Sequence, residues 1–535
     1  SIGDLQVGLV DAGTGDVTLD ATGYAITDAN AGANNITGNQ VQLFADNGIG
    51  SGNALETTIS ILEAQNVTAG NIEIINGVAL ELRDLNGDNY SIRNQAGGGA
   101  ITITNTGSLT VTDDVEANNG IITLTANSPI IVNAVINSGG GDIGLTANNA
   151  DGYIDINADI LSGGGDITLT AYGVDASDVS IDEDSSADIN AGAGNVTLRA
   201  LGANSGDMIL SDVIGATITA RAESGSILDD QDKTTSLQPQ NNANSLVLEA
   251  SEDIGAGTTR PGTYLDVTIP PTATPGTGWL TAGNAAIDAD GTDNIYLNIL
   301  GGDFYYSYIV SLYANNVVVF NTTGNDTYID VNPNSSAAEL HFYADSDIYV
   351  QSDITLTSAG ALLGLHAGND IDLSNLASYT IDIGGGTGTL VAEADVDGDN
   401  AGRVYTSNRL NLNIANLILM AATGIDVETT GTYNLAASND VSGGIDIDNI
   451  GDITVFDATA LGAYPNGIQN TATGIGLDDV VITVASSVNI NAPINTGGGD
   501  LYITATEDII HSAAGDITTS GGNYEGTADS DHSSP

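Results

Sequence analysis

The sequence contains no cysteine, and its 535 residues include only 8 lysines and arginines against 69 aspartates and glutamates. The missing cysteine excludes disulfide bonds, thiolate metal sites and cysteine nucleophiles. The formal net charge of -61 argues against nucleic acid or an anionic membrane as a partner, because no basic patch offsets the repulsion. No apolar run approaches the ~20 residues needed to span a bilayer.

Strong helix-forming charged residues are also scarce. Lysine occurs once, at Lys233, whereas glycine occurs 68 times, and Asn, Asp and Thr are abundant. These residues favour turns and strands over helices. Hydrophobic residues still make up 41% of the chain, and Val, Ile and Leu alternate with polar residues, which gives the chain an apolar face to bury. The composition therefore predicts an all-β fold.

One motif recurs along the chain. It reads V-I-N-S-G-G-G-D-I-G-L-T-A at 135–147, D-I-L-S-G-G-G-D-I-T-L-T-A at 159–171 and P-I-N-T-G-G-G-D-L-Y-I-T-A at 493–505. Looser copies begin at Gly15, Gly194, Gly206, Gly451 and Gly515. In I-T-L-T-A, Ile and Leu face one side and Thr the other, as in a strand with one buried face. Glycine reaches positive φ and Asp accepts turn hydrogen bonds, so G-G-G-D predicts a turn between strands.

A single unit of this kind cannot bury its apolar face alone, but stacking on similar neighbours does bury it. Recurrence at this period therefore predicts a solenoid. At ~22 residues per coil, the chain would form roughly 20–25 coils. The spacing is irregular, with 24 residues from Asp142 to Asp166 and 29 from Asp166 to Asn195, which predicts loops of different length.

The pattern N-A-x-I-N-[ST]-G-G-G-D-I-x-L-T-A resembles the repeats of filamentous haemagglutinin-type exoproteins and related bacterial surface proteins. The resemblance is strongest over residues ~115–215 and ~440–520, and it implies a right-handed parallel β-helix. The motif is fairly specific for this architecture but says almost nothing about which ligand, if any, the protein binds. The conserved N-terminal secretion domain of that family is not recognisable in this chain.

Composition divides the chain into four segments. Residues 1–228 and 351–520 carry the repeats. Residues 229–350 are first rich in proline and then rich in tyrosine, which predicts a β-rich insertion or a second β-module. Residues 521–535 are polar and glycine-rich, and we expect such a tail to be ordered by docking on a neighbouring subunit.

Three Asp-rich loops are candidate calcium sites. Their oxygen-bearing side chains are Asp84, Asn86 and Asp88; Asp395, Asp397 and Asp399; and Asp288, Asp290 and Asp293. Oxygen side chains at alternate positions around a glycine bend converge on one point, which suits Ca²⁺. None of the three has the full twelve-residue loop ending in Glu, and ordinary Asx turns in an Asp-rich chain share the pattern.

Signals for catalysis are sparse. The arginines are scattered, and His341, His366, His511 and His532 are far apart in sequence, without the spacing of metal ligands. No nucleophile elbow or phosphate-binding loop is present. Aromatic residues such as Tyr306, in the tyrosine-rich stretch 296–349, are expected either as stacked or half-buried strand residues or as a surface for glycans or subunits. We therefore expect a protein that is not an enzyme.

Taken together, these features predict an extracellular structural protein of the cell surface. A right-handed parallel β-helix would self-assemble as a homopolymer into a surface filament or sheath, since contacts that do not close a ring propagate. Ca²⁺ or high salt would favour the folded and associated state by screening the charge. Three alternatives stay open: a surface adhesin that binds glycans or matrix, a surface-layer protein, and a β-helix carbohydrate-active enzyme.

Overall fold

A computed structural model describes residues 3–230, 237–241, 243–255, 264–283, 294–321, 324–472 and 478–528. The protein is all-β with almost no helix, and its parallel strands stack into a β-solenoid of about 21 turns. The predicted parallel β-helix is thus confirmed. The chain divides into two compact units, Ser1–Tyr296 and Leu297–Pro535. Within the described residues, no helix has the length and apolar character that a membrane crossing requires.

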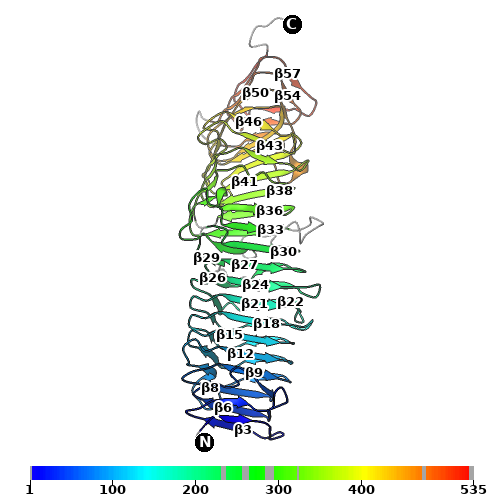
Figure 1. Ribbon diagram of the computed structural model, residues 1–535. Helices are drawn as coiled ribbons and strands as arrows, with labels where there is room; N and C mark the ends of the chain where they lie inside the picture. The colour runs from blue at the N-terminus through cyan, green and yellow to red at the C-terminus, as the bar shows by residue number, and fades with distance from the viewer. Residues whose placement is uncertain are drawn as a thin grey trace. The chain divides into compact units, whose positions relative to one another are not determined.

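Most coils of unit 1 contribute three short strands, which stack in parallel as three columns (Figure 1). The first column consists of β2 (Val10–Asp11), β5 (Ile36–Thr37), β7 (Leu55–Thr58), β9 (Ile72–Asn76), β12 (Ile101–Asn105), β15 (Ile122–Ala126), β18 (Ile143–Ala147), β21 (Ile167–Ala171), β24 (Val196–Ala200), β27 (Ile218–Ala222), β30 (Leu246–Ala250) and β32 (Leu280–Ala282). The second consists of β10 (Leu80–Leu82), β13 (Leu109–Val111), β16 (Ile130–Val132), β19 (Ile154–Ile156), β22 (Val179–Glu183), β25 (Asp207–Leu210) and β28 (Ile227–Asp229). The third consists of β11 (Tyr90–Asn94), β14 (Asp114–Ala117), β17 (Ile136–Asn137), β20 (Ile160–Leu161), β23 (Asp188–Asn190), β26 (Asp212–Gly215), β29 (Leu237–Pro239) and β31 (Leu265–Thr268).

The earliest coils of unit 1 are simpler. There the longer strands β3 (Val17–Ala21), β6 (Gln40–Ala45) and β8 (Ile61–Asn66) take the place of the second and third columns. Strand β8 pairs with both β10 and β11, so it is the point at which one column becomes two. Strands β1 (Leu5–Val7) and β4 (Ile26–Asp28) form a separate pair.

Stacked aliphatic side chains form the core of unit 1. Ile122 pairs with Ile101 of the coil before and with Ile143 of the coil after, and each of the three is at most 1% exposed. The intervening threonines point outward. Burying such a side chain contributes about 1.5–3 kcal/mol, and every coil repeats this contribution. A segment of this length is therefore stable only within the stack.

The glycines of the G-G-G-D motif have two different roles. Gly163 and Gly164 adopt the predicted positive φ angles of 69° and 128°. The third glycine, Gly165, is needed for another reason, because a Cβ there would overlap the carbonyl group of Gly141 in the preceding coil. The Ser162 hydroxyl donates a hydrogen bond to the Gly165 carbonyl oxygen, which closes the turn.

The aspartate of the motif connects successive coils. The sequence predicts a local turn acceptor at this position, but Asp142 Oδ1 accepts a hydrogen bond from the Asp166 backbone N–H at 2.8 Å, and Asp166 Oδ1 accepts one from the Asn195 N–H at 2.8 Å. The local turn acceptor is Asn137, whose Oδ1 accepts from the Gly139 N–H. In unit 2 the same contact to the preceding coil is made by the N–H groups of Asp326, Asp347, Asp370, Asp500 and Asn523.

Loops outside the columns absorb the irregular spacing of the repeats. Ile143, Ile167 and Val196 are separated by 24 and 29 residues but pair in register, with the loops 148–153 and 172–178 lying between strands. The motif copies that begin at Gly194 and Gly206 precede strands of different columns, β24 and β25. The 12 residues between Asn195 and Asp207 therefore lead from one column to the next and do not make up a full coil.

Unit 2 also stacks in parallel columns, and many of its strands are longer. One column runs through β36 (Asn316–Asn321), β38 (Glu339–Ala344), β41 (Leu362–Ala367), β44 (Thr389–Ala394), β47 (Asn416–Ala421) and β49 (Tyr433–Asn439), and then divides into β51 (Ile453–Val455), β54 (Val488–Ile490) and β57 (Ile509–His511) beside β52 (Ile468–Asn470), β55 (Ile494–Asn495) and β58 (Ile517–Thr518). A second runs through β34 (Phe304–Tyr305), β37 (Thr327–Ile329), β39 (Ile348–Val350), β42 (Ile371–Asp372), β45 (Val404–Tyr405), β48 (Ile425–Thr430), β50 (Ile445–Ile450), β53 (Val480–Val484), β56 (Leu501–Ala505) and β59 (Tyr524–Thr527). Strands β40 (Ile354–Leu356), β43 (Thr380–Ile383) and β46 (Leu410–Asn413) form a short column that joins β48.

The outer face of unit 2 carries an additional apolar cluster. The segment 456–467 contains the 3-10 turn η2 (Thr459–Leu461). It packs on the outer side of the unit 2 column that runs from β36 to β49. Its Ala458 forms a buried cluster with Val391, Ile418 and Ala436. These three positions face outward in their strands, so the segment shields a surface that would otherwise be apolar and exposed.

The described strands between 229 and 350 pair in parallel like the others, for example β26 with β29 and β37 with β39. The predicted segment boundaries at 228 and 350 stay a prediction. Tyr306 and Tyr308 lie in a short 3-10 turn, η1 (Tyr306–Tyr308), where both are buried, and β35 (Ile309–Leu312) follows. Of the tail, β59 pairs with β56, whereas residues 529–535 lie outside the described residues, so the predicted docking is not tested.

Candidate metal centre

The loop between β10 and β11 holds the first predicted calcium site. Asp84 accepts hydrogen bonds from the backbone N–H groups of Asn86, Gly87 and Asn89 at 2.6–2.9 Å. The Asn86 side-chain oxygen accepts from the Asp88 N–H at 2.9 Å. Asn86 therefore helps to fold the loop, and its oxygen is used within it.

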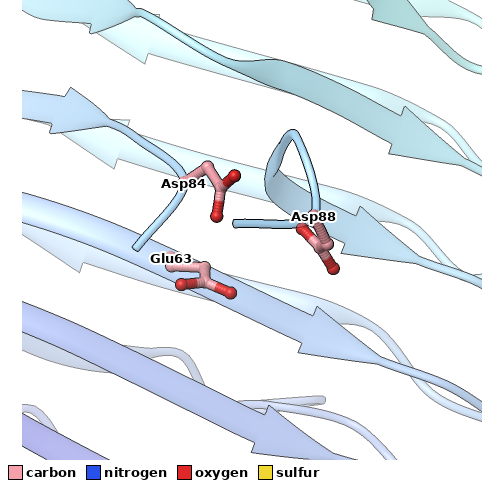
Figure 2. Close-up of side chains that lie close together, drawn as sticks. All are labelled: Glu63, Asp84 and Asp88. Carbon is pink, nitrogen blue, oxygen red and sulfur yellow. The ribbon is translucent and has the colours of Figure 1, made fainter. Parts of the chain in front are cut away.

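A residue from the preceding coil completes the cluster. Glu63 on β8 is 0% exposed, and its carboxylate lies with those of Asp84 and Asp88 such that one oxygen of each is within 4.8 Å of the others. Figure 2 shows Glu63 on one strand and the two aspartates at opposite ends of the loop that follows in the next coil. The sequence did not indicate Glu63, because this residue precedes Asp84 by 21 positions. The two residues are brought together only because they lie on neighbouring coils.

Neighbouring N–H groups partly neutralise this cluster. Glu63 accepts hydrogen bonds from Gln42 Nε2 at 2.9 Å and from the Leu85 N–H at 3.0 Å. Gln65 Nε2 donates to Glu63 at 3.2 Å and to Asp88 at 2.6 Å. The three carboxylates are thus held in place by fixed donors while their remaining lone pairs are free to accept a cation.

The electrostatics differ between the members of the cluster. Burial raises the pKa of Glu63, and the nearby charges of Asp88 and Asp84 raise it further. Burial also acts to raise the pKa of Asp84, but the backbone donors of the loop outweigh it, so the net pKa is lowered. The cluster therefore combines one carboxyl group whose pKa is raised and one whose pKa is lowered.

The second predicted site lies in the loop after β44. Asp395, Asp397 and Asp399 each have a carboxylate oxygen within 4.8 Å of the others, and the latter two residues are exposed. Asp395 accepts from the Asn400 N–H at 2.9 Å. Burial, followed by the charges of Asp399 and Asp397, raises the pKa of Asp395. The third predicted site, with Asp288, Asp290 and Asp293, lies outside the described residues.

Both described clusters suit a hard divalent cation. Ca²⁺ takes 6–8 oxygen ligands, and three carboxylates supply between three and six of them. Water would supply the rest. The two clusters differ in their scaffolds, because the first joins two coils whereas the second is confined to a single exposed loop.

No family model matches the chain, and no curated protein or solved structure is significantly similar to it. The resemblance to haemagglutinin-type repeats therefore stays a prediction that rests on the motif. The arrangement of the side chains is the remaining guide to function.

The structure corrects the expectation that the histidines are far apart for one pair, whereas His532 lies outside the described residues. His341 and His366 are separated by 25 residues, which is one coil, and their Nδ1 and Nε2 atoms are 3.2 Å apart. Burial and the neighbouring His366 lower the pKa of His341 to about 4. Sequence distance misled because a solenoid brings residues one coil apart into contact.

The aromatic residues of unit 2 form stacks between coils. The rings of Tyr305 and Tyr328 are 4.6 Å apart and nearly parallel, and Tyr349 continues the stack at 5.1 Å. The hydroxyl groups of Tyr328 and Tyr349 donate to Asp326 and Asp347. The stacked rings cover one another's faces, which fits the predicted stacked arrangement better than a platform for sugars.

Most arginines among the described residues form ion pairs with neighbouring carboxylates. The ion-paired arginines are Arg83, Arg93, Arg221, Arg403 and Arg409. Such half-exposed pairs contribute about 0–1 kcal/mol each, and they spread over many coils. They thus form local links in an acidic surface.

Proposed function

We propose that this chain is an extracellular structural protein that self-assembles into a surface filament or sheath, with divalent cations aiding the assembly. The role is mechanical. The solenoid provides a stiff and repetitive scaffold, and its acidic outer surface keeps chains apart until cations neutralise it. Homopolymer formation is the expected consequence, because contacts that do not close a ring propagate.

The observation that best supports a mechanical role is the use of the repeated motif. Gly165 allows two backbones to approach, and Asp166 holds the backbone of the next coil. The repeated residues therefore serve the connection between coils, and the recurrent chemistry is accounted for without a substrate. A repeat that maintained a ligand site would be expected to repeat unsatisfied polar groups.

Like charges stacked on successive coils support the role of cations. Asp155 and Asp182 are paired in register, and burial together with nearby aspartates raises the pKa of each. In unit 2, Asp426 is in register with Asp446, whose pKa is raised by burial and by the surrounding acidic residues. Like charges directly opposite one another destabilise a sheet, so a divalent cation that bridges them would stabilise the stack.

Electron microscopy and analytical ultracentrifugation of the full chain test the proposal. We expect filaments or bundles in Ca²⁺ and dispersed chains after chelation, with NaCl of matched ionic strength giving much weaker assembly. Unchanged assembly and melting temperature after chelation would contradict the role of calcium. Monomers under every condition would contradict the filament.

A matched pair of variants separates a discrete site from general screening. Glu63→Gln removes one charge from the cluster of Glu63, Asp84 and Asp88, whereas Asp151→Asn removes one charge from an exposed loop. We expect the increase in melting temperature that Ca²⁺ produces to fall in the first variant and to persist in the second. Flat arrays would favour a surface-layer protein, glycan binding by monomers would favour an adhesin, and cleavage of a polyuronate would overturn the structural role.

A further inference from the structure

Two histidines meet on the outer face of unit 2. His341 on β38 and His366 on β41 belong to successive coils, and His341 Nδ1 lies 3.2 Å from His366 Nε2. Their side chains are 16% and 7% exposed. The pair is thus partly shielded from water but open at one edge.

A carboxylate faces the other nitrogen of each ring. Glu393 Oε2 lies 2.9 Å from His366 Nδ1, and Glu339 Oε2 lies 3.7 Å from His341 Nε2. Both glutamates come from the same strand column as the histidines. The four side chains therefore form the sequence Glu339, His341, His366, Glu393 along the outer face.

The carboxylates decide where the protons lie. A neutral imidazole carries one N–H, and the contact with Glu393 places that of His366 on Nδ1, so its Nε2 presents a lone pair to His341. When the N–H of His341 is on Nε2, the nitrogen that faces Glu339 at 3.7 Å, its Nδ1 has a lone pair as well. Two lone pairs would then face each other across 3.2 Å, an arrangement that a cation between them stabilises.

The ordinary alternative is a hydrogen bond between the rings, which uses the N–H of His341 on Nδ1. If His341 Nδ1 carries the proton and donates to His366, the bare Nε2 of His341 faces the Glu339 carboxylate at 3.7 Å. Both atoms are then acceptors. A metal in place of the shared proton lets each distal nitrogen donate to its own carboxylate.

Gly364 leaves space for the contact between His341 Nδ1 and His366 Nε2. It stands in register with His341, and a Cβ at this position would overlap His341 Nδ1 and lie 2.6 Å from His366 Nε2. The two nitrogens thus occupy the space that a side chain would fill. Any other residue at this position would separate or displace them.

We propose that His341 Nδ1 and His366 Nε2 bind a single transition-metal dication, with Zn²⁺ as the reference ion, and that Glu393 and Glu339 orient the two rings from behind. Imidazole nitrogen favours Zn²⁺, Cu²⁺ and Ni²⁺, whereas Ca²⁺ requires oxygen. Two nitrogens bound at ~2.05 Å to a tetrahedral ion lie ~3.3 Å apart, close to the separation in this structure. Water completes the coordination, and the ion links two successive coils.

Zinc titration of the full chain tests this site, and the titration is made in a large excess of Ca²⁺ so that the acidic surface is already occupied. We expect one Zn²⁺ per chain by calorimetry, with Co²⁺ giving the absorption bands of nitrogen ligation. His341→Ala and His366→Ala should each weaken binding by at least about tenfold. His511→Ala, which alters an exposed histidine on β57, should leave it unchanged.

Two further variants separate metal binding from loss of structure. Glu393→Gln keeps both ligands and should weaken Zn²⁺ binding by ~10- to 100-fold, as outer-shell changes do. Gly364→Ala should block the site by filling it, and far-ultraviolet circular dichroism checks that the fold persists. The proposal is wrong if excess Ca²⁺ abolishes Zn²⁺ binding, if the His341→Ala/His366→Ala double variant binds as tightly as the wild type, or if no binding occurs. This test is independent of assembly.

Discussion

Each unit has an outward-facing glycine within a strand, and the two glycines have opposite surroundings. Gly144 of unit 1 stands between Thr123 and Thr168 on the outer face of its column, and nothing lies within 4 Å of the position of a Cβ. Gly364 of unit 2 stands between His341 and Val391, and ring nitrogens fill that position. The neighbouring leucines, Leu145 and Leu365, are buried in both strands, so the difference lies in the side chains that surround each glycine on the outer face.

The largest expected effect tests the shared interior. Leu145 of unit 1 and Leu365 of unit 2 are both 0% exposed, and replacing either with alanine leaves a cavity in a stack of aliphatic side chains. We expect each variant to lower the free energy of unfolding by about 2–5 kcal/mol, as measured by urea denaturation. A large loss in one unit and none in the other would show that the interiors are not equivalent.

A buried acid in each unit gives the next contrast. Glu183 of unit 1 is 1% exposed, and among the described residues its Oε1 has no hydrogen-bond partner. Burial raises its pKa to about 8. Asp372 of unit 2 is also fully buried, but its carboxylate accepts hydrogen bonds from Ser374, Ser407 and Asn375.

The sign of the Glu183 effect follows from linkage. The folded state holds the proton up to about pH 8, whereas the unfolded chain releases it near its ordinary pKa, so stability falls as pH rises between these values. Glu183→Gln removes this loss, and its gain over the wild type should grow from pH 5 to pH 9, reaching the order of a few kcal/mol. Asp372→Asn should instead destabilise at pH 7, because an amide cannot accept all of those hydrogen bonds. A pH-independent difference for Glu183→Gln would contradict the buried proton.

The two glycines provide the direct test of the outer faces. Gly364→Ala should lower the free energy of unfolding by about 1–3 kcal/mol, because the added methyl group displaces both rings. Gly144→Ala should raise it by about 0.4–1 kcal/mol, because the unfolded chain loses entropy and the methyl group meets no obstacle. Denaturation of the two single variants measures the difference, and equal effects would remove the distinction.

The smallest expected effect concerns the aspartates that connect coils. Asp166→Ala in unit 1 and Asp500→Ala in unit 2 each remove the acceptor for an N–H of the next coil, and each should cost about 1 kcal/mol. Asp166→Asn retains a side-chain oxygen, and Asn195 already occupies this register position, so that variant should lose less. Equal losses for alanine and asparagine would indicate that charge, rather than hydrogen bonding, is responsible.

The sequence predicted the stack of parallel strands, but it did not predict most of the contacts between residues of successive coils. The alternation in I-T-L-T-A identified the buried face, and the first two glycines of the motif were predicted correctly from their conformational freedom. The role of Gly165 and the partner of Asp166 depend on the neighbouring coil. Glu63 and the His341–His366 pair were missed for the same reason, since loops of irregular length hide which residues are one coil apart.

The hydrogen bonds that the motif aspartates make between coils share one direction. In each case the carboxylate belongs to the earlier coil and the donor to the later one, as with Asp142 and Asp166 or Asp479 and Asp500. A finished coil therefore presents preformed acceptors to the segment that follows it in the chain. The chain can add one coil at a time as a template-directed process from N to C, and it need not wait for its full length before it begins to fold.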